Sequence, residues 1–108
     1  MIIVIDLGEQ RVHLRQPDDF ARFSVAVEGS GAASALADMV HRSGLGRLRP
    51  DGQHVVVDPV ALRALAGPAA TPQWEEGLAA MCAYAAGKGW VEDDGGILAH
   101  IEEGGEPG

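Results

Sequence analysis

The sequence is poor in several features that decide the class of a protein. It has one cysteine, Cys82, in 108 residues. A single cysteine excludes an internal disulfide framework and indicates a reducing compartment. No apolar run approaches the eighteen or so residues of a membrane span. The apolar start at residues 2–5 is too short for a signal-peptide core and has no basic leader. We therefore expect a cytoplasmic protein that does not bind a membrane.

Aromatic residues are also few. Two Phe, two Trp and one Tyr make up 5% of the chain, whereas hydrophobic residues of all kinds make up 46%. The core should therefore consist mainly of Ala, Val and Leu. A chain of this length normally has one domain with one core. We expect a single globular domain over residues 1–103 and a frayed tail over residues 104–108.

Basic residues are almost absent from the last third of the chain. Residues 67–108 contain eight acidic side chains against Lys88 alone, while residues 1–66 contain eight acids and seven arginines. An acidic segment of this kind repels nucleic acid and anionic membranes. It favours a basic partner, or it serves only to keep the protein soluble. We expect a protein partner or self-association, and no nucleic acid.

Runs of β-branched residues predict the strands. The first two strands flank a turn candidate at Gly8-Glu9-Gln10 and form a predicted hairpin. Pro50-Asp51-Gly52 predicts the turn of a second hairpin, because proline presets φ and glycine accepts positive φ. The predicted strands are residues 2–7, 11–15, 22–28 and the two halves of 46–57.

Capping residues and apolar periodicity predict the helices. Thr71-Pro72 is a strong helix start, and Trp74, Leu78, Met81 and Ala85 then form an amphipathic stripe. The predicted helices are residues 31–43 with Ser30 as candidate N-cap, a short helix from Asp58-Pro59 to Gly67-Pro68, and residues 72–88. The expected fold class is α+β, with a small, mainly antiparallel sheet of two hairpins plus one strand that is covered on one face by two to three helices.

The stretch GKGWVEDDGG, residues 87–96, places three carboxylates after a tryptophan between glycines. A calcium loop around Gly95 or Gly96 would put Trp90 or Val91 at its first ligand position, so both registers fail. We interpret the stretch as a helix end instead. Gly87 and Gly89 would supply the left-handed conformation, and Trp90 with Val91 would form the apolar contact that accompanies such a cap.

Tests for catalytic and metal motifs fail elsewhere in the chain. Cys82 lies far from any helix start and is expected to be a core thiol. Gly29-Ser30-Gly31 lacks the spacing and the lysine of a phosphate loop. The histidines have no metal-ligand spacing, and the serines lack a G-x-S-x-G context. These residues are His13, His41, His54 and His100, and Ser24, Ser30, Ser34 and Ser43. We expect no metal or cofactor, although a site assembled from distant residues stays open.

Two functional hypotheses remain. The first is a noncatalytic accessory or regulatory domain that binds another protein. Its expected contact surface is acidic and consists of Glu92, Asp93, Asp94, Glu102 and Glu103. The second is a small enzyme or small-anion-binding protein. Its pocket would consist of His41, Arg47, Arg49 and His54. The basic and acidic sets would also suit a homodimer in which they pair across a twofold axis. We favour the first hypothesis because every motif test for chemistry fails.

Overall fold

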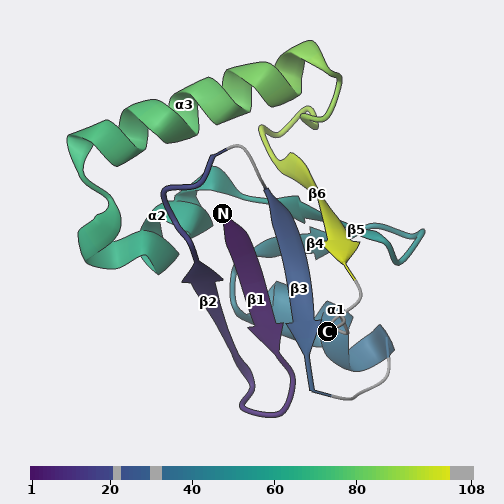
Figure 1. Cartoon of the computed structure of the whole chain (residues 1–108). Coiled ribbons are helices and arrows are strands. Elements are labelled where there is room, and N and C mark those ends of the chain that lie inside the picture. The colour runs from purple at the N-terminus through teal and green to yellow at the C-terminus, as the bar shows by residue number, and fades with distance from the viewer. Residues whose placement is uncertain (21–22, 30–32, 103–108) are drawn as a thin grey trace.

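Figure 1 shows the computed structural model of the chain, which describes residues 1–20, 23–29 and 33–102. Within these residues one sheet of six strands forms, in the order β2-β1-β3-β6-β5-β4. The strands are β1 (Ile2–Asp6), β2 (Arg11–Arg15), β3 (Ser24–Glu28), β4 (Gly46–Leu48), β5 (His54–Val57) and β6 (Ile97–Glu102). The α+β class and both predicted hairpins are confirmed.

The sheet is mixed, so the expectation of a mainly antiparallel sheet built from two hairpins and one strand is wrong. Strand β3 lies parallel to β1, and β6 lies parallel to β3 and antiparallel to β5. The unpredicted strand β6 therefore joins the two hairpin-containing halves of the sheet. Strand order depends on pairing between residues far apart in the chain, which local sequence patterns do not record.

Three α-helices and one 3-10 turn complete the described residues. They are α1 (Ala33–Arg42), α2 (Pro59–Ala66), η1 (Gly67–Ala69) and α3 (Pro72–Gly87). The predicted caps of α2 and α3 are confirmed. The Asp58 carboxylate accepts a hydrogen bond from the Val60 amide, and the Thr71 hydroxyl accepts one from the Trp74 amide. Ser30, the candidate cap of the first helix, lies outside the described residues.

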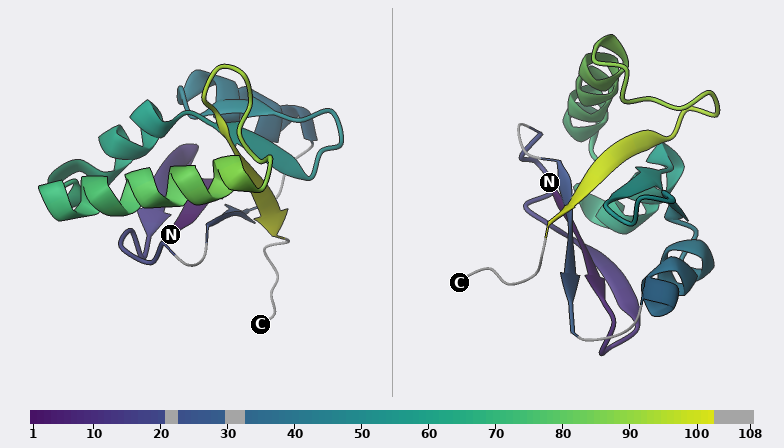
Figure 2. Two further views of the ribbon diagram at one scale, coloured as in Figure 1. Left: turned by 90° about the horizontal axis from the view of Figure 1, so that it is seen from above. Right: turned by 90° about the vertical axis from the view of Figure 1, so that its right-hand side faces the viewer.

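Helices α1 and α2 lie on one face of the sheet, while α3 lies across its end (Figure 1, Figure 2). This is the end at which the parallel strands β1, β3 and β6 begin. The C-terminal half of α3 therefore lies next to the start of β6, and the groove described below forms there.

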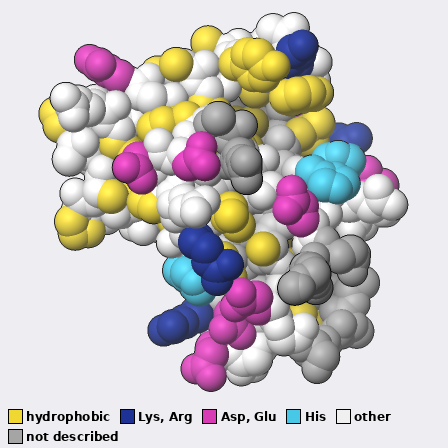
Figure 3. All heavy atoms as spheres, viewed as in Figure 1, with side chains coloured by type: hydrophobic (Ala, Val, Ile, Leu, Met, Phe, Trp, Pro, Cys, Tyr) yellow, Lys and Arg dark blue, Asp and Glu magenta, His cyan; other side chains and the backbone are white. Residues whose placement is uncertain are grey.

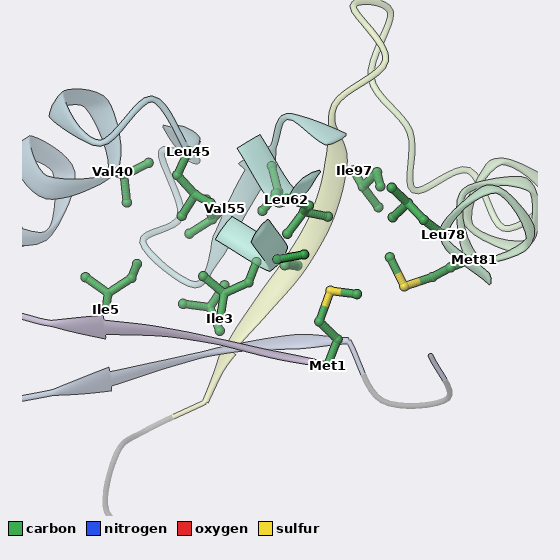
Figure 4. Close-up of a cluster of buried hydrophobic side chains, with 14 of the residues drawn as sticks. Met1, Ile3, Ile5, Val40, Leu45, Val55, Leu62, Leu78, Met81 and Ile97 are labelled. Atoms are coloured by element: carbon green, nitrogen blue, oxygen red, sulfur yellow. The ribbon is translucent and has the colours of Figure 1, made fainter. Parts of the chain in front are cut away.

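The core lies between the sheet and the three helices. Ile3 and Ile5 of β1 point into it together with Val55 of β5 (Figure 4). The stripe predicted for α3 is confirmed, since Trp74, Leu78, Met81 and Ala85 are all buried. The remaining buried members of the cluster are Met1, Val25, Met39, Val40, Leu45, Val57, Leu62, Ala66, Ile97 and Ala99.

Candidate functional site

A groove of about 450 Å³ lies between the C-terminal half of α3 and strands β5 and β6. Core side chains of Met81, Ala85 and Ile97 contribute to its apolar wall. Its other walls include four of the five aromatic residues and two histidines, namely Phe20, Phe23, Tyr84, Trp90, His54 and His100. In Figure 3 hydrophobic side chains gather over this end of the molecule, and histidine side chains lie beside them.

Two aromatic side chains of the groove are exposed. Tyr84 is 62% exposed and Trp90 is 46% exposed, and their rings meet in a T-shaped contact with centroids 6.1 Å apart. The amino group of Lys88 lies 5.5 Å from the centroid of the Tyr84 ring. Among the described residues, the other large hydrophobic side chain with comparable exposure is Val60, which lies on α2 outside the groove.

The end of α3 places Trp90 beside Tyr84. Gly89 has a φ of 78°, and the Trp90 amide donates a hydrogen bond to the Ala85 carbonyl at 2.9 Å. The Gly89 amide donates to the Ala86 carbonyl at 3.1 Å, which completes a Schellman motif. The predicted helix end is confirmed, and Trp90 makes its apolar contact with Tyr84. Gly89 is the left-handed residue. The expectation of a left-handed conformation at Gly87 is wrong, because Gly87 is the last residue of the helix.

The chain then turns sharply and enters β6. The Leu98 amide donates to the Trp90 carbonyl at 2.8 Å, and the Glu92 amide donates to the Gly96 carbonyl at 2.8 Å. Gly95 takes a φ of 89° at the turn. Glu92, Asp93 and Asp94 belong to the predicted acidic contact surface, and they lie on a tight turn directly after Trp90. We call these three residues the acidic loop.

The acidic loop contacts two arginines of the predicted anion pocket. Arg47 lies 2.6 Å from the Asp94 carboxylate, and Arg49 lies 3.1 Å from the Glu92 carboxylate. The hydrogen bond from Arg47 lowers the pKa of Asp94, and the hydrogen bond from the Gly96 amide lowers it further. Two arginines of the predicted anion pocket therefore pair with two carboxylates of the predicted acidic contact surface, within one chain.

The other predicted site residues take no part in these ion pairs. His41 is exposed on the last turn of α1, whereas His54 lies on β5 and lines the groove. Asp93 is exposed in the acidic loop, and Glu102 is exposed at the end of β6. Glu103 lies outside the described residues. Of the predicted pocket, His41 therefore lies on α1 and His54 lines the groove, while Arg47 and Arg49 pair with the acidic loop.

The groove contains a histidine pair that the sequence reasoning missed. His54 and His100 are directly opposite each other on the antiparallel strands β5 and β6, and their ring centroids lie 5.2 Å apart. The Nδ1 atom of His54 lies 3.0 Å from the Asp51 carboxylate. The alternation of Ile97, Ala99 and Ile101 was the signal that could have placed His100 on a strand.

A serine lies on the other side of His100. Ser24 on β3 is the Cα partner of His100, so Ser24, His100 and His54 form a row on one face of the sheet. Within the described part of the chain no hydrogen bond joins the Ser24 hydroxyl to His100, and the Ser24 side chain is buried. This arrangement lacks the nucleophile–base contact that hydrolysis by a serine requires.

The described residues contain neither a three-residue metal cluster nor an activated thiol. In the described ranges, no three side chains of His, Cys, Asp or Glu lie close enough together to hold a metal ion between them. Burial raises the pKa of the Cys82 thiol, and Arg63 offsets part of this effect. Cys82 packs against the core as predicted, and a raised pKa disfavours the reactive thiolate.

Comparison of the chain with known protein families, with curated proteins and with solved structures found no match. Over the described residues, no helix combines the length and the apolar character that a membrane crossing needs.

Proposed function

We propose that the protein is a noncatalytic accessory domain that binds another protein, and that the groove is its binding site. The observation that carries this proposal is the exposure of Tyr84 and Trp90 beside one groove. Tyrosine and tryptophan are enriched among the residues that supply most of the energy at protein interfaces. A chain with five aromatic residues has little reason to expose two of them together unless they bind something.

The occupant that we propose is a partner segment with a large hydrophobic side chain flanked by basic residues. The apolar wall of the groove accepts the hydrophobic side chain. The basic flanks follow from charge, because the chain has a net charge of -8 and the acidic loop comes directly after Trp90. Arg47 and Arg49 pair with Asp94 and Glu92, so Asp93 is the member of the loop best placed to attract a basic residue.

A second candidate function is the binding or conversion of a small molecule in the same groove. The observation that favours it is the pair of histidines on an otherwise apolar wall. A volume of about 450 Å³ also falls within the range of small-molecule pockets. This candidate retains His54 from the predicted anion pocket, while Arg47 and Arg49 bind the acidic loop.

Affinity capture with matched variants tests the proposal. The tagged protein would be incubated with lysate of its own source at low and high salt, beside the variants Tyr84→Ala and Val60→Ala. Tyr84 and Val60 are both exposed, at 62% and 65%, but only Tyr84 lines the groove. We expect a stoichiometric, salt-sensitive protein partner that Val60→Ala retains and Tyr84→Ala loses. The expected weakening is about thirtyfold, which corresponds to roughly 2 kcal/mol for an interface hot spot.

Two results would contradict this proposal. A partner that Tyr84→Ala and the wild type capture equally would bind elsewhere on the surface. A protein that captures no partner but carries a small molecule, identified by mass spectrometry after denaturation, would favour the second candidate.

A further inference from the structure

The histidines of the groove are held close together by the sheet. His54 and His100 face each other on β5 and β6, and the Ile101 amide donates to the Gln53 carbonyl at 2.8 Å. This bond lies on one side of the pair, so His54 and His100 occupy a non-hydrogen-bonded position of the ladder. Side chains are closest at such positions, where the two Cα atoms are about 4.5 Å apart. The backbone therefore brings the two imidazoles together before any ligand binds.

Asp51 fixes one of the two rings. Its carboxylate lies 3.0 Å from Nδ1 of His54, and its other oxygen accepts a hydrogen bond from the Gln53 amide at 2.8 Å. An ionised carboxylate only accepts hydrogen bonds, so in the neutral imidazole this contact places the proton on Nδ1 and leaves the lone pair on Nε2. Histidines that bind metals in proteins are commonly oriented by a carboxylate in this way.

We infer that His54 and His100 form a two-histidine site for a divalent transition-metal ion such as Zn²⁺ or Ni²⁺, with Asp51 as the positioning residue. Imidazole nitrogens bind these ions at about 2.0–2.1 Å, which places two nitrogens of a tetrahedral site roughly 3.3 Å apart. The ring centroids lie 5.2 Å apart, and binding of the ion requires that the His100 ring turn until one of its nitrogens reaches this separation from Nε2 of His54. The remaining coordination positions belong to water or to a donor atom of a molecule in the groove.

The site has two protein ligands, which limits its affinity for the metal ion and leaves coordination positions open. The described residues contain no third ligand close enough to complete it, so the ion binds more weakly than at a four-ligand structural zinc site. Both histidines line the groove, so the open positions are available to whatever occupies it. The metal site does not depend on the proposed function, because the ion would bind the protein in the absence of any partner.

Titration of Zn²⁺ into the purified protein tests the inference. Binding would be followed by calorimetry, and the histidine ring signals by nuclear magnetic resonance. We expect one saturable site, with shifts in the ring signals of His54 and His100. His54→Ala and His100→Ala should each weaken binding by more than tenfold, and Asp51→Asn should weaken it about tenfold to a hundredfold. His41→Ala is the matched control, since His41 is exposed on α1, and it should leave the affinity unchanged.

Carboxylates of this acidic chain could also attract cations, so the variants decide the result. Circular dichroism would first establish that each variant is folded, and His100→Gln would replace His100→Ala if the alanine variant is not. The inference is overturned if Zn²⁺ does not bind saturably. It is equally overturned if the folded double variant of His54 and His100 binds Zn²⁺ as the wild type does.

Discussion

Trp74 connects the start of α3 to the chain segment before β3. Its side chain is 4% exposed, its ring centroid lies 6.1 Å from that of Phe20, and its Nε1 donates to the Pro17 carbonyl at 2.8 Å. We predict that Trp74→Ala lowers the free energy of unfolding by about 3–5 kcal/mol, because it removes a large core side chain and a hydrogen bond. Urea denaturation measures this change. A loss below about 1 kcal/mol would contradict the packing of α3 described above.

Gly46 is required by the close approach of two strands. It has a φ of 154°, and a Cβ atom there would lie 1.7 Å from the Val56 carbonyl oxygen. Gly46→Ala should therefore disrupt the pairing of β4 with β5. Gly52→Ala is the matched control, because Gly52 also has a positive φ, of 70°, but its Cβ would meet no atom within 4 Å. We expect Gly52→Ala to cost about 1–2 kcal/mol and Gly46→Ala to cost clearly more in thermal unfolding. Equal losses would contradict the observed pairing.

At the scale of elements, the acidic loop is tied to β4 by the ion pair of Arg47 with Asp94. Because the pKa of Asp94 is lowered in the folded protein, this pair stabilises the fold above the unfolded pKa of about 3.9 and loses this effect as the pH falls through the lower pKa of the folded protein. We predict that Asp94→Asn is less stable than the wild type at pH 7 in low salt, and that the difference shrinks towards pH 3. The Arg47–Asp94 pair is exposed, so the difference should also shrink at high salt.

Urea unfolding at pH 7 and pH 3 measures this difference. Asp93→Asn is the matched control, because it removes an equal charge from the same loop and leaves the Arg47 contact intact. The ion pair would have no role in stability if Asp94→Asn and the wild type differed equally at both pH values.

The elements that the sequence predicts are those with local signals. Asp58-Pro59 and Thr71-Pro72 carry their capping and proline chemistry in adjacent residues, and the Gly89 helix end is equally local. Strand β6 was not predicted, although Ile97, Ala99 and Ile101 alternate with less buried residues as in a strand. Its partner residues on β3 and β5 lie 76 and 40–46 residues earlier in the chain, at distances that periodicity cannot reveal.

At the scale of the whole molecule, the groove could not be read from the sequence. Its aromatic and histidine residues come from the loop before β3, from β5, from the end of α3 and from β6. These segments lie far apart in the sequence, and only the fold brings them together around the groove. The sequence predicts that the basic and acidic sets pair between two copies of the chain. In the structure Arg47 and Arg49 bind the acidic loop of the same chain.

The measurement that tests the central claim most directly uses the two tryptophans as reporters. Trp90 lines the groove and is exposed, whereas Trp74 is buried and outside it. Their indole N–H signals would be recorded by nuclear magnetic resonance while the captured partner is added to the labelled protein. We predict that the Trp90 signal shifts or broadens with the partner and that the Trp74 signal does not. An unchanged Trp90 signal at saturating partner would show that the partner binds elsewhere and would contradict the account.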